Sequence, residues 1–385
     1  MTYHLAVAAA ICLVLTASST TQAIEVQVGN RAQSMGQAFT AVADDPSAVL
    51  HNPAGLTQIP NTEIDVGLSL NVINLDYTDA TGVTHPADEN VLVPTLFAST
   101  DTLNPVVVGI GFYVPWGSKA ELAADAASAF PYLRSELVRY DLTLAAAYQF
   151  NEVLSAGIGF TTGYARVKND VPVSATDRLL EDADGFGFSG VAGVLWTPAS
   201  WFKAGLNYRG PMQVSLSGDA TLAGIDDTFT TDLNFPGTLS AGIAVIPIED
   251  LTVSFDFDWT HWQVFEDIVR DYATLPTTTQ PINGTDAHDY RIGFEYRAFE
   301  KTHFRAGYSY QENGWPAQTV LPSELDHTLH VISAGLSQFV WKMRIDLAYE
   351  FSTAVGFTVT DNINGFNGDY DGIRHIALLT TAFKF

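Results

Sequence analysis

Residues 341–351 read WKMRIDLAYEF, and this stretch decides the fold. Apolar and aromatic side chains occupy every second position, and all but one of the positions between them are charged. A period of two is that of a β-strand, whose successive side chains point to opposite faces. The stretch is longer than the roughly six residues of a soluble strand and matches the roughly ten that a tilted strand needs to cross a bilayer. It predicts a membrane-spanning strand with an apolar outer face and charges that point inward.

The same alternation recurs along the chain, for example at 63–72, 140–150 and 251–260. It predicts strands at 62–76, 91–100, 105–117, 138–150, 153–168, 185–196, 201–217, 232–246, 251–265, 287–298, 302–311, 327–339, 342–352 and 371–385. An even number of antiparallel strands can close into a barrel that leaves no free edge in the membrane. We therefore predict an all-β fold, a 14-stranded antiparallel transmembrane β-barrel.

The connections between these strands are unequal, because short turns such as 101–104 and 197–200 alternate with long segments. The long segments are 77–90, 118–137, 169–184, 218–231, 266–286, 312–326 and 353–370. Outer-membrane barrels have short periplasmic turns and long external loops. The long segments contain 23 acidic and four basic residues, so the predicted outer rim carries most of the net charge of −25. Two interpretations stay open: a solvated acidic face, or carboxylates that share divalent cations with outer-membrane lipids and lipopolysaccharide.

Composition excludes several classes of protein. The 385 residues are 47% hydrophobic and only 16% charged, which argues against a disordered chain or a coiled coil. The negative net charge argues against a nucleic-acid partner. Cys12 is the only cysteine, so no disulfide and no cysteine-based zinc site can form. We find no nucleophile-elbow, zincin or P-loop motif, and we expect no enzyme activity, no metal and no cofactor.

The N-terminus differs from the rest of the chain. Residues 5–15 form an apolar run too short to span a bilayer as a helix, which predicts a signal peptide at 1–23. Residues 24–61 are small and polar and do not alternate. Irregular backbone at membrane depth is tolerated only when it is buried in protein or faces water. We therefore predict an N-terminal hatch at 24–61 that plugs the lumen of a barrel formed by 62–385.

Motifs in this order resemble a known family. Gly36, then 43–45 (Ala-Asp-Asp), then 52–54 (Asn-Pro-Ala) resemble the hatch of the outer-membrane long-chain fatty acid transporter family, the FadL type, whose relatives take up aromatic hydrocarbons. The resemblance continues through 233–236 and 290–292 to the terminal phenylalanine, essentially the whole mature chain. It implies a monomer in the bacterial outer membrane that binds a hydrophobic small molecule, rearranges its hatch and releases the ligand sideways. The implied hatch and gate residues are Gly36, Asp44, Asp45, Asn52, Pro53 and Ala54.

Pro115 marks a second feature, at the end of the third predicted strand. Proline has no backbone N–H to donate to a neighbouring strand. The segment either simply ends the strand or, as the resemblance implies, kinks it and opens a gap in the wall. The residues concerned are Val114, Pro115, Trp116 and Gly117. Trp116 would then line the gap or join an aromatic girdle at the membrane surface, where we also expect Trp196, Trp201, Trp259, Trp262 and Trp341.

The ligand class stays open between fatty acids and neutral hydrocarbons. The family's two basic residues for the ligand carboxylate align with Val171 and Ala287, neither of which is basic, although Lys168 and His288 are near. The loop after the fifth strand is also short and acidic. The candidate ligand-binding residues are Ile24, Val26, Arg166, Lys168, Val171 and His288.

Two alternative functions remain. A barrel-embedded lipase needs a Ser–His pair on neighbouring strands, and a general porin should lack a plug as long as residues 24–61.

The first prediction concerns the fold itself. The mature protein purified in detergent should give a β-type circular dichroism spectrum and should migrate differently on gels before and after heating, as closed barrels do. A predominantly helical spectrum, or a monomer that is soluble without detergent, would contradict the barrel.

Overall fold

The computed structural model describes residues 24–25, 28–86, 88–122, 133–172, 177–312, 314–320, 328–354, 356–363 and 365–385. The predicted signal peptide and the candidate ligand residue Val26 lie outside the described residues, as does the side chain of Ile24. None of the helices in the described part of the chain is long and apolar enough to span a membrane.

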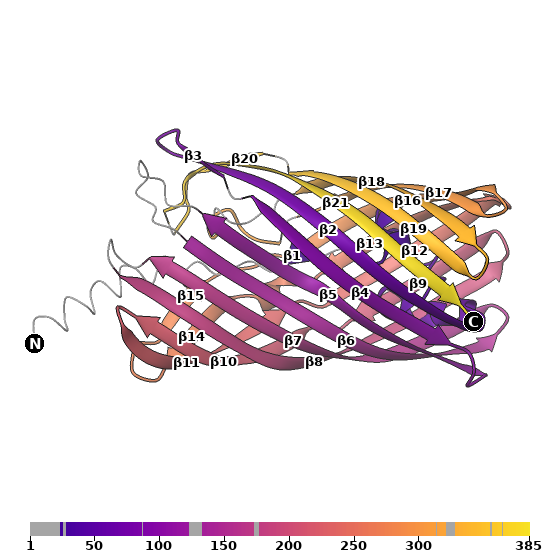
Figure 1. Ribbon diagram of the computed structural model, residues 1–385, viewed down its shortest axis with the longest axis horizontal. Helices are drawn as coiled ribbons and strands as arrows, with labels where there is room; N and C mark the ends of the chain where they lie inside the picture. Colours follow the sequence, from indigo (N-terminus) through magenta and orange to yellow (C-terminus); the bar gives the residue numbers. More distant parts are fainter. Residues whose placement is uncertain are drawn as a thin grey trace, which may run out of the picture.

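Fourteen strands form the wall of a closed antiparallel barrel, as predicted (Figure 1). They are β2 (Thr62–Asp79), β4 (Glu89–Thr100), β5 (Val106–Leu122), β6 (Leu133–Asn151), β7 (Leu154–Pro172), β8 (Arg178–Ala199), β9 (Phe202–Arg209) continued by β10 (Met212–Leu222), β11 (Ile225–Phe235) continued by β12 (Thr238–Ile248), β13 (Leu251–Thr260), β16 (Ala287–Phe299), β17 (Thr302–Gln311), β18 (Leu329–Val340), β19 (Met343–Ala354) and β21 (Gly368–Lys384). The last strand, β21, pairs with the first, β2, from Glu63 opposite Lys384 to Asp79 opposite Gly368. This pairing closes the barrel and removes both sheet edges.

The alternation of the sequence becomes the two faces of the wall. Ile158 and Phe160 of β7 are exposed on the outer face, where a membrane supplies the apolar surroundings. Arg344 and Asp346 of β19 are buried on the inner face, 2.8 Å apart from Nε to Oδ2. Charges that would be costly in lipid are therefore paired inside the barrel.

The two ends of the barrel differ as predicted, but several predicted loops are strands. Short turns and the C-terminus lie at one end, and the longer connections lie at the other (Figure 1). The predicted connection 218–231 is instead a continuous β10–β11 hairpin, paired from Met212 opposite Phe235 to Leu222 opposite Ile225. The predicted connection 169–184 shrinks to the few residues between β7 and β8. Four short strands, β3 (Thr84–Pro86), β14 (Asp267–Tyr272), β15 (Thr278–Pro281) and β20 (Phe357–Val359), occupy other predicted loops.

These extensions reverse the polarity of the wall. On β10, Val214 and Leu216 are buried inside, whereas Ser215 and Ser217 face outward. On β8, the outward residues change from Phe186 and Phe188 to Asp182 and Asp184. The wall therefore continues beyond the apolar belt, with a polar outer surface around an apolar interior.

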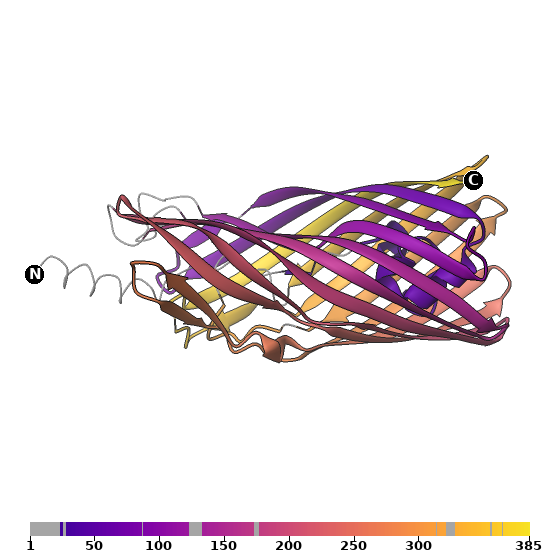
Figure 2. The ribbon, with the colours of Figure 1, turned by 90° about the horizontal axis from the view of Figure 1, so that it is seen from below.

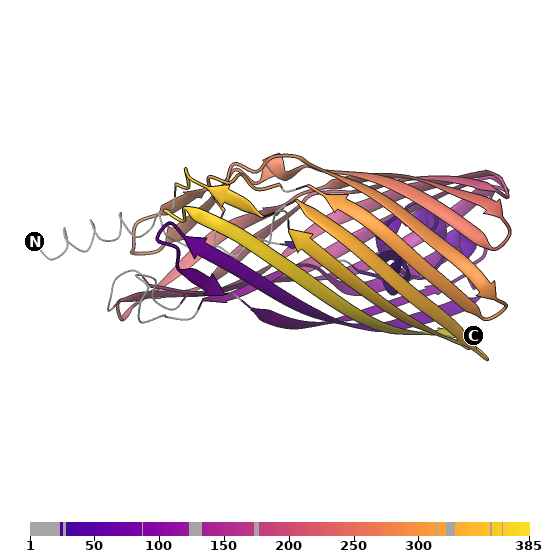
Figure 3. The same ribbon diagram turned by 90° about the horizontal axis from the view of Figure 1, so that it is seen from above.

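Residues 28–61 lie inside the barrel, nearer the end with the C-terminus (Figure 2 and Figure 3). They include α2 (Asn30–Ser34), α3 (Ala48–His51) and the 3-10 helix η2 (Pro53–Gln58). Inward-facing wall glycines receive this segment: Gly109, Gly157, Gly193, Gly205, Gly242, Gly293, Gly307 and Gly335. A Cβ on Gly193 would lie 2.1 Å from Asn52 Oδ1, and one on Gly307 would lie 2.1 Å from the Gly36 nitrogen. Only glycine permits such a close approach.

Buried charges hold the same segment to the wall. Arg31 lies 2.6 Å from Asp44 within the segment and 3.1 Å from Glu295 of β16. The backbone N–H groups of Phe39 and Thr40 donate to one carboxylate oxygen of Asp256, at 2.8 and 2.7 Å. Charge-assisted hydrogen bonds of this kind are stronger than neutral ones. The segment is therefore fixed by electrostatics as well as by shape.

The second prediction concerns the buried charge network at the base of the barrel. Arg344 is 3% exposed and contacts Glu63, Asp65 and Asp346 at 2.8, 3.2 and 2.8 Å. Arg344→Met removes the cation that these three carboxylates share and leaves Glu63 with Lys384 at 3.1 Å and Asp346 with Arg305 at 3.8 Å. It should lower the free energy of unfolding by about 3–5 kcal/mol, as for other broken buried ion pairs. The measurement is denaturant unfolding in lipid bilayers.

The control for this prediction is Arg297→Met. Arg297 is also on a wall strand, but it is exposed and pairs with Glu249 and Asp250 at the turn. We expect no measurable change there, because exposed ion pairs contribute little. Equal effects of the two substitutions would contradict a structural role for the buried network.

The third prediction concerns the contact between the N-terminal segment and the wall at Gly193 of β8. Gly193→Ala should displace the turn at Asn52 and Pro53, because the new Cβ would overlap Asn52 Oδ1. Single-channel conductance should then rise while the barrel still folds. On the same strand, a Cβ at Gly190 would meet only the Gly159 oxygen, at 3.6 Å, so Gly190→Ala is the matched control. Unchanged conductance in a folded Gly193→Ala barrel would refute the close contact between Gly193 and Asn52.

Candidate functional site

The wall is interrupted between β4 and β5. Their pairing runs from Thr100 opposite Val108 to Leu96 opposite Phe112, and within the described residues it extends no further. Beyond this point β5 continues beside β6, with a shift of register between Tyr113 and Trp116. The shift leaves the two residues between them, one of which is Pro115, outside the regular ladder. The missing proline N–H and the bulge explain why β5 separates from β4 here.

A cavity of about 160 Å³ occupies the interruption. Its lining is mainly apolar and comes from β2, β4, β5, β6 and β21; it includes Val91, Val93, Val114, Gly117, Leu137 and Val138. Lys119 of β5 and Glu89 of β4 approach each other across the interruption, with their charged atoms 3.3 Å apart. The short strand β1 (Ile24–Glu25) pairs with β5 at the same level, with Ile24 opposite Gly117. The interruption is therefore partly covered, not open to lipid along its length.

The other side of the kinked segment faces the lumen. Pro115 lines a polar cavity of about 50 Å³, and Tyr113 and Trp116 line a neighbouring one of about 30 Å³. Val114 and Gly117 instead line the cavity of about 160 Å³ between β4 and β5, which we call the lateral cavity. The kinked segment is thus a partition one strand thick between the lumen and the lateral cavity.

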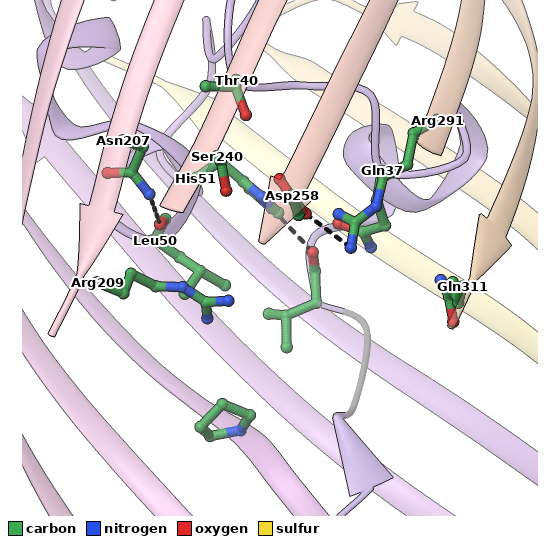
Figure 4. Close-up of a pocket in the computed structure, with 12 residues that line it drawn as sticks. Gln37, Thr40, Leu50, His51, Asn207, Arg209, Ser240, Asp258, Arg291 and Gln311 are labelled. Atoms are coloured by element: carbon green, nitrogen blue, oxygen red, sulfur yellow. Dashed lines mark hydrogen bonds and ion pairs between the residues drawn. The ribbon is translucent and has the colours of Figure 1, made fainter. Parts of the chain in front are cut away.

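The polar cavity lies between the N-terminal segment and the wall (Figure 4). Arg209, Asp258 and Arg291 reach toward it from three strands, and an Arg291 nitrogen lies 2.8 Å from Asp258. On the floor, His51 Nε2 is 3.0 Å from the Val28 carbonyl oxygen. Burial lowers the pKa of His51 to about 4, so the imidazole is neutral at physiological pH. The N-terminal segment therefore presents a floor of fixed, mostly neutral groups to the lumen.

An aromatic cluster fills the lumen beyond this cavity. Trp116 meets Trp262 edge-on with ring centroids 5.4 Å apart, and Phe235 is 6.0 Å from Trp116. Trp315 lies 5.9 Å from Trp262 and extends the cluster. The guanidinium of Arg139 lies 4.4 Å from the Phe235 ring centroid. Its members are buried in one continuous group with Met212, Leu216 and Ile268, so the lumen carries an apolar core of its own.

This cluster corrects one expectation. Trp262 was expected in a girdle at the membrane surface, but it is buried inside the barrel. It belongs to the 3-10 helix η3 (Trp262–Val264), which follows the end of β13 and turns the side chain inward. Trp196, Trp201 and Trp341 are exposed. These tryptophans all lie near strand ends, so that position alone does not predict which side chain is buried in the lumen and which is exposed.

The predicted hatch and gate residues all lie in the N-terminal segment, but they contact different strands. Gly36 packs against the backbone of Tyr308, and Asp44 and Asp45 both approach Arg31. The Asn52 side chain donates to the Thr40 and Val194 carbonyl oxygens and accepts from the Ala54 N–H.

Pro53 lies against Gly157 of β7, where a Cβ would sit 2.5 Å from the Pro53 carbonyl carbon. The Asn-Pro-Ala turn therefore contacts both β7 and β8.

The four candidate ligand-binding residues whose side chains the structure describes do not come together in the lumen. Val171 is buried on the inner face, but Arg166 and Lys168 are on the outer face of β7, where both approach Asp182. His288 alternates with inward Ala287 and lies 2.9 Å from Glu312. Successive side chains of a strand point to opposite faces, so these three basic side chains lie outside the lumen and do not join the aromatic cluster.

The residues that the sequence reasoning missed are the inner aromatic and apolar ones, such as Phe235 and Trp315. A signal was available for Phe235, because it continues the alternation of Leu233 in the segment that resembles the family. Among the described residues, no group of three His, Cys, Asp or Glu side chains could hold a metal ion.

The geometry agrees with comparisons to known proteins. Residues 10–385 match the family model described as outer membrane protein transport protein (OMPP1/FadL/TodX). A long-chain fatty acid transport protein of Escherichia coli O6:H1 is 23% identical over 398 residues, which cover 88% of this chain and 89% of the relative.

Two solved structures share the fold. A Pseudomonas aeruginosa FadL homologue superimposes with a TM-score of 0.85 at 16% identity, over 94% of this chain and 100% of the other. The Pseudomonas putida toluene transporter TodX gives 0.80 at 17% identity, over 95% and 100%. The family match spans nearly all of the barrel just described, and the protein therefore belongs to the OMPP1/FadL/TodX family of bacterial outer-membrane transport proteins.

Proposed function

We propose that this transporter takes up small, neutral, apolar molecules about the size of one aromatic ring and releases them sideways between β4 and β5. The interruption of the β4–β5 ladder, with its lateral cavity, is the observation that carries the proposal. A ligand would bind among the luminal aromatic side chains, pass the kinked segment of β5 and enter the membrane without crossing bulk water. Burial of apolar surface, worth about 25 cal/mol per Å², supplies the driving force without energy coupling.

Size supports an aromatic ligand. The lateral cavity measures about 160 Å³, close to the roughly 150 Å³ of an engineered apolar cavity that holds benzene in another protein. The two luminal cavities described above are smaller, about 50 and 30 Å³, so any ligand must displace side chains there, and a long alkyl chain would have to displace more of them than a single ring. TodX, which has the same fold, is a toluene transporter.

Charge supports a neutral ligand. Two basic residues beside the aromatic cluster are already paired: Arg139 makes two hydrogen bonds of 2.8 Å with Asp141, and Arg270 approaches Glu181 at 3.5 Å. The basic candidates Arg166 and Lys168 lie on the outer face. A fatty acid carboxylate in the lumen would therefore find no unpaired cation among these residues. A buried charge without a partner is unfavourable.

We further propose that residues 24–61 act as the gate and that the protein has no enzymatic activity. The hatch fills the barrel end near the short turns, which opposes a general porin. Histidines on the strands bond tyrosines or carboxylates, as in Tyr308–His330, Tyr349–His375 and His288–Glu312. None of these pairs supplies the Ser–His couple of a lipase.

The fourth prediction tests the lateral route. Val93→Cys on β4 with Val114→Cys on β5 places two thiols on the lining of the lateral cavity, in a mature chain without other cysteines. Joining them by oxidation to a disulfide, or by a short bifunctional thiol-reactive cross-linker, should reduce toluene uptake by cells at least tenfold. Reduction of the disulfide should restore it, and toluene binding to the purified protein should persist.

The control joins β4 and β5 where their ladder is intact. Ala98 is opposite Ile110, so Ala98→Cys with Ile110→Cys should cross-link without affecting uptake. If the cross-linked Val93–Val114 variant is folded, binds toluene and imports it at the rate of the reduced protein, the lateral route is wrong.

A further inference from the structure

A row of polar side chains borders the apolar interior on the hairpin of β14 and β15. Thr231 of β11 is opposite Arg270 of β14, and Arg270 is opposite Thr278 of β15. All three are buried on the inner face. Ile268 and Ile282, from the same hairpin region, belong to the group of apolar side chains that contains Trp116 and Trp262. Polar and aromatic surfaces therefore meet inside the extended part of the wall.

Glu181 of β8 reaches this row across the interior, although β10 and β11 lie between β8 and β14 in the wall. Its carboxylate accepts hydrogen bonds from Asn169, at 2.8 Å, and from the Tyr272 hydroxyl. Arg270 Nε lies 3.5 Å from the same group. Glu181 is thus already hydrogen-bonded, and its charge balances that of Arg270.

The row keeps unused hydrogen-bonding groups. Arg270 Nη1, Thr231 Oγ1 and Gln280 Oε1 are buried and have no hydrogen-bond partner. Arg270 is only 2% exposed. A buried donor without an acceptor costs free energy, more so on a charged group, and a matching ligand atom recovers it. Gln280 is opposite Ile268, and Thr231 is two residues from Phe229 on β11, so these residues border the apolar cluster, where a ligand body would pack.

We propose that Arg270 and Thr231, whose Nη1 and Oγ1 can both donate, form a head-group subsite for an incoming ligand that has an apolar body and one neutral hydrogen-bond acceptor. The body packs against Ile268 and Phe229, and Arg270 Nη1 donates to the acceptor. The ligand class is an aromatic aldehyde, ketone or ester. Because Glu181 already neutralises Arg270, a carboxylate would add an unbalanced buried charge and is disfavoured. This inference rests on the proposed function and refines its substrate class.

The fifth prediction uses two probes of similar shape, p-xylene and p-tolualdehyde, and the anion p-toluate, with binding measured by calorimetry in detergent. The wild-type protein should bind p-tolualdehyde about tenfold more tightly than p-xylene, because hydrogen bonds to charged donors are among the stronger ones. The double variant Glu181→Gln with Arg270→Met keeps the site neutral and should lose this preference while its affinity for p-xylene stays within about twofold.

A single change tests the charge balance. Glu181→Gln leaves Arg270 without its counter-charge and should raise the affinity for p-toluate about tenfold, an effect that a purely structural Arg270 would not produce. Thr231→Val, which preserves the ion pair, should reduce the preference for p-tolualdehyde by about threefold. Arg297→Met, at the opposite rim, removes a charge of the same type and should change neither ratio.

The outcomes separate the two proposals. Equal binding of the two neutral probes by the wild-type protein would overturn the subsite and leave hydrocarbon uptake intact. So would a preference that survives in the folded double variant, or an unchanged affinity of Glu181→Gln for p-toluate. If the double variant does not fold, the Thr231→Val and Glu181→Gln ratios decide alone. Failure of both neutral probes to bind would instead overturn the proposed function.

Discussion

Hydrocarbon offers no hydrogen-bond partner to a peptide group, and each unpaired group costs several kcal/mol there. Closure of β21 onto β2 meets this constraint around the barrel. The constraint is relaxed where β4 and β5 part beyond Phe112. There β1 pairs with β5 at Gly117, and Lys119 approaches Glu89 across the interruption. The interruption is tolerable because other parts of the same chain cover its exposed backbone.

The N-terminal segment and the wall depend on each other. Wall glycines leave room for the segment's backbone, and without it they would border an empty space. Arg31 joins the segment to Glu295, which in turn contacts Arg305 of β17 at 2.5 Å. Movement of the segment would therefore disturb charges on several strands at once. In the proposed role of a gate, the segment would have two defined positions more readily than a continuous range, because packed interfaces do not deform gradually.

Much of the barrel could be predicted, because lipid outside and charge inside impose a period of two. The period of two also holds in the β10–β11 hairpin, but there the apolar residues face inward and the polar residues face outward. Because the polar residues resemble those of a loop, the sequence alone predicts a connection at 218–231 in place of strands. The alternation of side chains along β7 would have placed Arg166 and Lys168 on the outer face of the barrel, because Ala165 and Val167 face the lumen. Trp262 lies an even number of residues after the buried Asp256 and Asp258, so the alternation of the predicted strand 251–265 would also have placed it inside, although η3 and not a strand holds it there. Contacts across the lumen, such as Arg270 with Glu181, join strands that are distant in sequence and leave no local pattern.

The extension of the wall beyond Phe186 has a thermodynamic consequence. An apolar solute outside the cell meets a polar sugar layer before it meets lipid, and its low solubility there limits its flux. The β10–β11 hairpin surrounds residues such as Leu216 and Phe229 with an outer surface of serine, threonine and aspartate. The protein thereby moves the boundary between water and oil outward from the lipid surface. On the proposed route a solute would leave water at the tip of the barrel and then pass along an interior that is largely apolar there.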